Sequence, residues 1–257
     1  MYRRVITSFV VLKDRIQKNI AKKSWMELAR SRALTLCFLC AFIGTRVAFG
    51  YCSSFYKNEG ACALTLRPVH LFEDPFRFMT QWFTRIWVHS NIRHLFFLSA
   101  FNFVAMQYAE LKWGTLKTCV VAFSLDFISI VLGTLYVGAG DYVYPNGWHR
   151  KRLHWNWRGS STLMYAISGA LAASSSYAHW WTCAHVVFDW VWLYFIGRRL
   201  RWFRAPGFTV AMLHSISFSV GLIYGAYAQK GRKRRLHIGA GVLGLICMFI
   251  CNLMPNF

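Results

Sequence analysis

Long apolar segments alternate with short basic connections along most of the 257-residue chain. The apolar segments lie near residues 33–50, 95–109, 117–138, 161–178, 208–228 and 236–254. Inside a bilayer each backbone amide and carbonyl has to be paired internally, and segments this long achieve this as helices rather than as barrel strands. The pattern therefore predicts an all-α, multi-pass transmembrane bundle with about six spanning helices.

The residues after the fourth apolar segment have a different pattern. Residues 179–204 contain the run His179-Trp180-Trp181 and then Trp190, Trp192 and Tyr194, together with Asp189. Trp and Tyr rings concentrate where the membrane meets water. We therefore expect Cys183–Gly197 to form an interfacial helix, with a membrane span over the same residues as the alternative.

Composition and charge support a membrane protein. Hydrophobic residues make up 56% of the chain, and 30 Lys and Arg face only nine Asp and Glu, for a net charge of +21. Two basic clusters lie at helix ends and in connections, at Arg198, Arg199, Arg201 and Arg204 and at Arg232, Lys233, Arg234 and Arg235. This placement suits anionic phospholipids such as cardiolipin, and acidic partner subunits, better than nucleic acid.

The amino-terminal arm, residues 1–32, is basic and amphipathic. It carries nine Lys or Arg but only Asp14 and Glu27, and its apolar residues recur at roughly helical spacing. It lacks the longer apolar stretch and small-residue cleavage site of a secretory signal. The arm predicts mitochondrial targeting, with a cytosolic membrane-surface helix as the alternative. Residues 33–257 form the predicted transmembrane domain.

The eight cysteines do not form a disulfide framework. Five of them lie inside apolar segments, where a free thiol behaves as a small hydrophobe: Cys37, Cys40, Cys119, Cys247 and Cys251. Cys52 and Cys62 lie in the first loop and are expected to pair only if that loop faces an oxidising compartment. The sequence leaves this choice open.

Three motifs, in order along the chain, resemble those of the rhomboid family of intramembrane serine proteases. The first has His89, a second histidine five residues later at His94, then Glu110 and Gly114. The second, residues 159–170, resembles the family's nucleophile helix, GxSGxxxAxxG. The third, residues 237–244, resembles its last helix, in which a histidine is followed by spaced glycines.

The resemblance implies a Ser–His pair on two helices that run in the same direction across the membrane. By position, Ser161 corresponds to the nucleophile and His237 to its general base. The family stabilises the oxyanion with a histidine that corresponds to His94, with an Asn four residues later, and with the nucleophile's own amide. The resemblance gives Glu110 a structural role.

Four departures from the family pattern argue against catalysis. Leu98 occupies the Asn position, and the next Asn, Asn102, lies one helical turn further along. Thr162 replaces the Gly after the nucleophile and is expected to crowd an approaching substrate. A basic run precedes His237 and disfavours its imidazolium form. Ser161 and His237 are also 76 residues apart, more than two helices and a short loop need.

These observations predict a non-catalytic, rhomboid-like structural subunit of a large membrane complex in the mitochondrial inner membrane, of respiratory-chain, ATP synthase or translocase type. The alternatives are an active intramembrane serine protease that uses Ser161 and His237, and an inactive rhomboid that binds membrane clients. The histidines of residues 149–185 lack acidic or cysteine partners at ligand spacing, so no metal and no cofactor are expected. Asp126, inside an apolar segment, is expected to pair with an Arg or His of a neighbouring helix.

Overall fold

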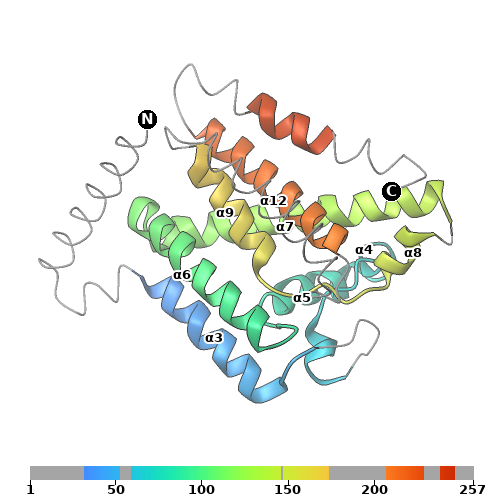
Figure 1. The fold of residues 1–257 in the computed structure, drawn as a ribbon, viewed down its shortest axis with the longest axis horizontal. Coiled ribbons are helices and arrows are strands. Elements are labelled where there is room, and N and C mark those ends of the chain that lie inside the picture. Colours follow the sequence, from blue (N-terminus) through green and yellow to red (C-terminus); the bar gives the residue numbers. More distant parts are fainter. Residues whose placement is uncertain (1–31, 53–58, 146, 174–206, 229–237, 247–257) are drawn as a thin grey trace, which may run out of the picture.

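The computed structural model describes residues 32–52, 59–145, 147–173, 207–228 and 238–246 (Figure 1). Its elements are α3 (Ala33–Phe49), η1 (Gly60–Leu64), α4 (His70–Glu73), α5 (Pro75–Arg85), α6 (Ile92–Trp113), α7 (Thr115–Val143), α8 (Trp148–Leu153), α9 (Ser161–Ala173) and α12 (Gly207–Tyr227). Residues 238–246 form a further helix. Within these ranges the fold is all-helical, apart from one isolated bridge between Leu66 and Trp157.

Several predictions from the sequence fall on residues outside these ranges. They are the arm up to residue 31, the interfacial helix at Cys183–Gly197, both basic clusters and His237. His94 and Asn102 belong to α6, but their side chains are likewise outside what the structure describes.

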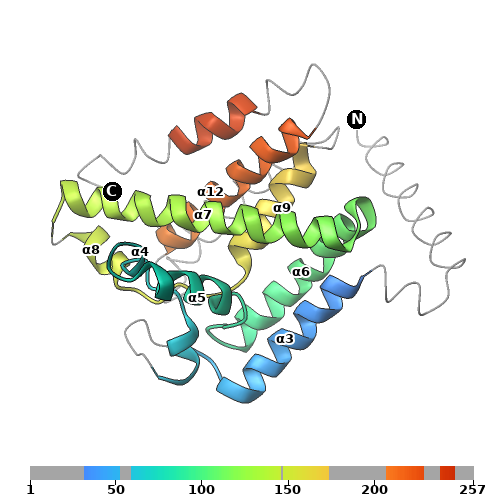
Figure 2. The same cartoon turned by 180° about the vertical axis from the view of Figure 1, so that it is seen from behind.

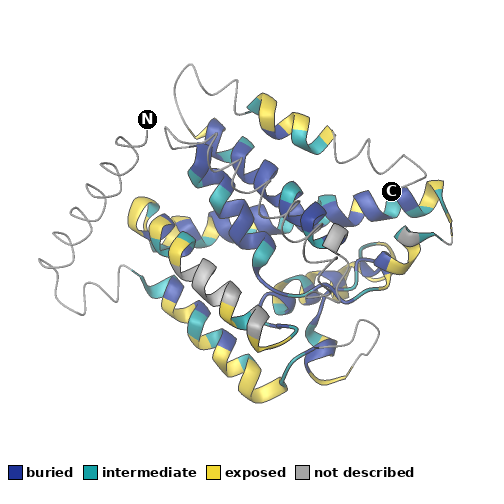
Figure 3. Ribbon diagram, in the orientation of Figure 1, coloured by how far each residue is buried: buried dark blue, intermediate teal, exposed yellow. Residues whose placement is uncertain are grey.

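Helix α9 lies at the centre of the described bundle, between α12, α7 and α6 (Figures 1 and 2). Ten of its thirteen residues are buried, as the dark-blue ribbon in Figure 3 shows. Four alanines and Gly169 give this helix a narrow surface, which lets neighbouring helices approach its backbone closely. Helices α3 and α6 pack side by side at one edge of the bundle.

The prediction of about six spanning helices is not supported. Among the described residues two helices are long and apolar enough to cross a membrane, Thr115–Val143 and Thr209–Tyr227. Helix α3 and helix α9 are apolar but have only 17 and 13 residues. Helix α6 has 22 residues, and polar residues such as Arg93 and Gln107 lower its hydropathy.

Large apolar side chains cover the outer surface of α3, α6 and α7. The exposed ones include Ile43, Val47, Phe96, Val104, Leu116, Val120, Ile128 and Leu135. So many exposed large apolar side chains are unusual for a protein surrounded by water and are typical of a surface that contacts lipid or another protein. The exposed apolar surface and the two long apolar helices therefore both indicate a membrane protein.

Two loop regions meet near the amino-terminal end of α9. The segment between α3 and α6 contains η1, α4 and α5, and the segment between α7 and α9 contains α8. Backbone hydrogen bonds join them: Leu66 and Trp157 exchange two bonds, of 2.9 and 2.7 Å, and the Val69 amide donates to the Leu153 carbonyl at 2.9 Å. The turn that leads into Ser161 is therefore held by the first loop.

Candidate functional site

Ser161 is the first residue of α9 and is half-buried. The turn before it contains Gly159, whose φ of 93° lies in the left-handed region that favours glycine. The predicted nucleophile thus stands at a helix start, directly after a sharp turn, as the resemblance implies.

His237, the predicted base, is outside the described residues, so the Ser161–His237 pair stays a prediction. The helix that follows it packs against α12: Gly241 lies against the Ser219 carbonyl and the Ile223 side chain, and Gly244 lies against the Ser219 side chain. Because later residues of this helix meet earlier residues of α12, the two helices run in opposite directions. Helix 238–246 therefore begins beside the carboxyl-terminal part of α12.

Helix α12, by contrast, runs parallel to α9 and touches its backbone. A Cβ atom on Gly169 would collide with the Phe218 carbonyl, and one on Gly221 would collide with the Ala166 carbonyl. Further along, a Cβ on Gly225 would collide with the Ala170 carbonyl. Residue numbers increase together along the two helices, so α9 and α12 have the relation that the resemblance implies for the nucleophile helix and the histidine helix.

This parallel packing places His214 of α12 against α9. Its ring stacks on Tyr165, with 4.0 Å between the ring centroids and 20° between the ring planes. Both residues are buried. Tyr165 is four residues after Ser161, so these two residues lie on one face of α9, one turn apart. The structure therefore brings His214 to the face of α9 that carries Ser161.

His214 was not among the site residues predicted from the sequence, although the chain contains a signal for it. Ser217, Gly221 and Gly225 follow His214 at spacings of three, four and four residues, a small-residue stripe like the one that follows His237. Only 53 residues separate Ser161 and His214. The polar residues Ser215, Ser217 and Ser219 around His214 made this segment look like an ordinary apolar helix with scattered serines.

A buried ion pair lies beside the Ser161 turn. Arg85 Nη2 contacts Asp126 Oδ2 at 2.5 Å and Oδ1 at 2.7 Å, and the two side chains are 2% and 0% exposed. Arg85 faces inward because it shares one face of α5 with Phe78 and Gln81, which are also buried. The expectation that Asp126 pairs with a basic residue of a neighbouring helix is confirmed.

Two more side chains donate hydrogen bonds to Asp126. The Thr162 hydroxyl reaches Oδ1 at 2.5 Å, and the Trp82 indole reaches Oδ2 at 2.8 Å. Thr162 is 2% exposed. Its hydroxyl is directed toward α7, which differs from the expectation that Thr162 crowds the substrate side of Ser161.

Glu110 binds the amino-terminal end of α3. Its carboxylate accepts hydrogen bonds from the Leu34 and Thr35 amides, both at 2.9 Å, and from the Thr35 hydroxyl at 2.5 Å. It also accepts one from the Thr115 hydroxyl at 2.9 Å. The residue before the helix, Arg32, provides no side-chain cap. Glu110 therefore caps α3 from a distant helix, which confirms the structural role expected for it.

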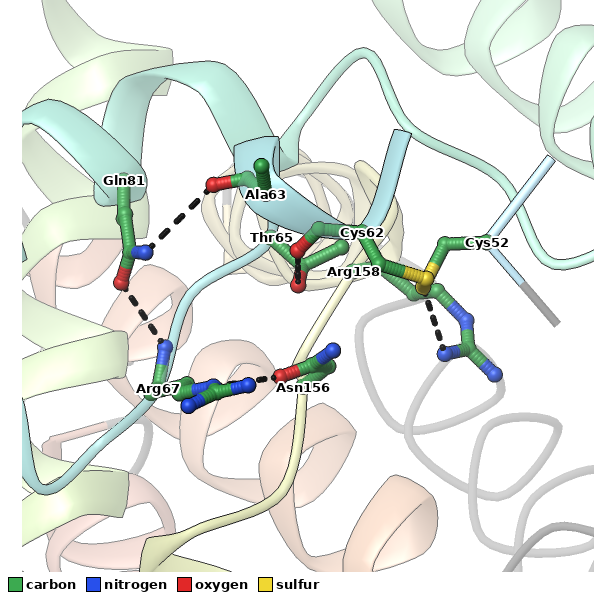
Figure 4. The surroundings of a disulfide bond; sticks show 8 residues. All are labelled: Cys52, Cys62, Ala63, Thr65, Arg67, Gln81, Asn156 and Arg158. Atoms are coloured by element: carbon green, nitrogen blue, oxygen red, sulfur yellow. Dashed lines mark hydrogen bonds between the residues drawn. A yellow bond between two sulfur atoms is a disulfide. The ribbon is translucent and has the colours of Figure 1, made fainter. Parts of the chain in front are cut away.

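Cys52 and Cys62 form a disulfide, which answers the question that the sequence left open. Figure 4 shows Arg158 beside it, with Nη1 at 3.5 Å from Cys52 Sγ, and Arg67 joined to Asn156 across the two loops. The Cys52 amide donates to the His89 carbonyl at 3.1 Å. The disulfide loop is thus packed against both the His89 turn and the Ser161 turn.

Burial lowers the pKa of two groups in these turns. Desolvation lowers the pKa of His89 to about 4, although a hydrogen bond with the Trp87 carbonyl acts in the opposite direction. Desolvation likewise lowers the pKa of Arg158 to about 10. At neutral pH His89 is uncharged and Arg158 is charged. Among the described residues no three His, Cys, Asp or Glu side chains come together as metal ligands.

No protein-family model, no curated protein and no solved structure matches this chain. The site is therefore interpreted from its own geometry and from the motifs in the sequence.

Proposed function

We propose that this chain is a rhomboid-like integral membrane protein in which Ser161 and His214, rather than Ser161 and His237, form a serine-hydrolase pair. The observation that supports this proposal is the stacking of His214 on Tyr165, one turn from Ser161, between two parallel helices in backbone contact. The reaction would be hydrolysis of a peptide bond in a membrane-embedded polypeptide.

The chemistry follows from the two groups. The Ser161 hydroxyl attacks the substrate carbonyl while the His214 imidazole accepts its proton, and the imidazolium then gives that proton to the leaving amine. A hydroxyl and an imidazole that hydrogen-bond to each other satisfy both groups when buried, so such a pair would be tolerated at membrane depth. The Tyr165 ring fixes the plane of the imidazole.

Three of the four departures noted in the sequence lose their force with His214 as the base. None of the nine residues directly before His214 is basic, and its separation from Ser161 needs no insertion. The Thr162 side chain is held by Asp126. The fourth departure, Leu98, remains: loss of one oxyanion donor lowers the rate by about 10²–10³ in serine hydrolases. We therefore expect slow turnover.

Labelling of the detergent-solubilised full chain with a fluorophosphonate probe tests the pair. Wild-type protein is expected to be labelled at Ser161, and Ser161→Ala is expected to abolish labelling. His214→Asn should slow labelling by about 10²-fold or more, because the general base is lost. His237→Asn is the matched variant and should label at the wild-type rate. Equal labelling of the His214 variant and wild type would overturn the assignment.

A second candidate is the non-catalytic membrane subunit, and Leu98 favours it because an oxyanion site without that donor is poorly suited to catalysis. Its partners would be other membrane subunits and anionic phospholipids, and its proposed location is the mitochondrial inner membrane. It predicts no labelling, and co-purification with a large complex at fixed stoichiometry that Ser161→Ala leaves unchanged. Substoichiometric, detergent-sensitive partners would instead indicate an inactive rhomboid that binds clients.

A further inference from the structure

We propose that the buried Arg85–Asp126 pair is a positioning device for Ser161, which holds the residues on both sides of it at fixed distances. The proposal rests on the assignment of Ser161 as the reactive residue of the proposed function. It gives a role to the acidic group in the middle of α7, where an unneeded charge would be expensive.

The first contact is with the turn before Ser161. Arg85 Nη1 donates to the Gly159 carbonyl at 2.7 Å, and the Gly159 amide donates back to the Arg85 carbonyl at 2.9 Å. Gly159 is therefore bound through both of its backbone polar groups to one residue of α5. These two bonds fix the turn that leads into α9.

The second contact is with the residue after Ser161. Arg85 Nη2 donates to the Thr162 hydroxyl at 3.0 Å, and this hydroxyl donates to Asp126 Oδ1 at 2.5 Å. Thr162 thus bridges the two charged groups. Because Gly159 and Thr162 are both held by the same guanidinium, Ser161 between them has little freedom to move.

Apolar packing alone would hold this helix less specifically. Buried ion pairs are often no more stabilising than apolar side chains of similar volume, so stability is a weak reason for this one. The guanidinium is rigid and planar and offers donors in fixed directions, which apolar contacts do not provide. Trp82 completes the hydrogen bonding of the carboxylate. The arrangement suits a residue whose hydroxyl must be placed to within a fraction of an ångström.

Two substitutions of Thr162 separate positioning from a structural role. Thr162→Val keeps the shape of the side chain but removes the hydroxyl, whereas Thr162→Ser keeps the hydroxyl. We expect Thr162→Val to slow fluorophosphonate labelling of Ser161 by about 10²-fold, as a displacement of about 1 Å would. Thr162→Ser should restore the rate, although both variants should lower the thermal unfolding midpoint, Thr162→Val through the lost hydroxyl and Thr162→Ser through the lost methyl group. Labelling that follows the unfolding midpoint instead of the hydroxyl would overturn the proposal.

A second readout does not depend on catalysis. In the Ser161→Cys variant, alkylation of residue 161 by a membrane-permeant maleimide is followed by mass spectrometry of the full chain in detergent. Adding Thr162→Val should speed this alkylation by about tenfold, since one hydrogen bond fewer opposes local opening. Adding Thr162→Ser should not.

The two readouts fail in distinguishable ways. If wild-type Ser161 is never labelled but the alkylation rates differ as expected, the proposed hydrolase function is wrong and the positioning role stands. If the alkylation rates are equal with Val and Ser at residue 162, the positioning role is wrong whatever the labelling result.

Discussion

Two contacts of α9 are held by different physical means. In the contact with α12, Gly169, Gly221 and Gly225 remove side chains from the interface and bring the backbones into contact. In the contact with α5 and α7, at the start of α9, a charged pair binds the turn that precedes the helix and the side chain of Thr162. The first contact is apolar and close-packed, and the second is polar and directional.

The difference indicates a division of roles. Close packing of small residues holds two helices together and sets their distance, but its attraction does not depend strongly on direction. Hydrogen bonds to a charged group are directional and fix a rotation and a register. The contact with α12 therefore brings His214 to α9, and the contact with α5 and α7 sets where Ser161 stands relative to it.

Asp126→Ala should have the largest effect on the polar contact. It leaves the Arg85 guanidinium buried without its counter-ion, and removing one partner of a buried pair costs about 3–5 kcal/mol. The measurement is the free energy of unfolding in mixed micelles, titrated with SDS.

The double variant Arg85→Met with Asp126→Leu is the control for Asp126→Ala. It removes both charges and should recover most of the stability, because no charge is left unpaired. If the double variant were as unstable as the single one, the loss of stability would come from lost side-chain packing and hydrogen bonds and not from an unpaired charge.

Gly221→Ala tests the close-packed contact in the same way. The added methyl group meets the Ala166 carbonyl, and because backbone has to move, we expect a loss near about 3 kcal/mol, the upper end for overpacking. Gly44→Ala in α3 is the matched control, since nothing lies within 4.0 Å of its Cβ position. The control should be neutral or stabilising by up to about 1 kcal/mol. Equal effects of the two substitutions would contradict the packing interpretation.

Glu110→Gln tests how much a polar contact outside the Ser161 turn contributes to the free energy of unfolding. The amide keeps one acceptor oxygen but turns an NH₂ group toward hydrogen-bond donors, so we expect a loss of about 2 kcal/mol. Glu73→Gln, at an exposed position of α4, should change stability by no more than about 0.5 kcal/mol. Thermal unfolding in detergent measures both. An effect confined to the amino-terminal part of α3 in hydrogen exchange would localise the loss.

The last prediction concerns the pH dependence of stability that His89 causes. Its pKa is about 4 in the folded chain against an ordinary 6.5, so the folded state favours the neutral ring. The resulting stabilisation is complete above pH 6.5 and is lost as the pH falls toward 4, at about 1.4 kcal/mol per pH unit. Unfolding measured between pH 7.5 and 4.5 should show this slope, and His89→Gln should reduce it. An unchanged slope in the variant would assign the pH dependence to other groups.

The sequence predicted the positions of the helices better than their number of membrane crossings. Helices α3, α6, α7 and α12 lie where apolar runs were found, because a long apolar run leaves the backbone no alternative to helix. The predicted number of spans was not supported, because an apolar run was equated with a crossing, whereas among the described residues only α7 and α12 contain helices long and apolar enough to cross a membrane. Length and polar content decide that question.

The candidate site was only partly predictable. Ser161, Glu110 and the pairing of Asp126 follow from motif spacing and from the cost of burying a charge. The positions of His214 and Arg85 near the start of α9 depend on which helices pack together. No local sequence pattern predicts that packing. The direction of α12 relative to α9 decides that His214 stacks on Tyr165, one turn from Ser161.

The Cys52–Cys62 disulfide assigns the two faces of the proposed membrane protein to different chemical environments. Disulfides persist in oxidising compartments, and Arg158, which lies against Cys52, is three residues before Ser161. Ser161 therefore belongs to the oxidising face. Helix α12 runs parallel to α9, so in the proposed membrane protein its Tyr227 end lies toward the opposite, reducing face. A polypeptide cut at Ser161 would then be released on the oxidising side.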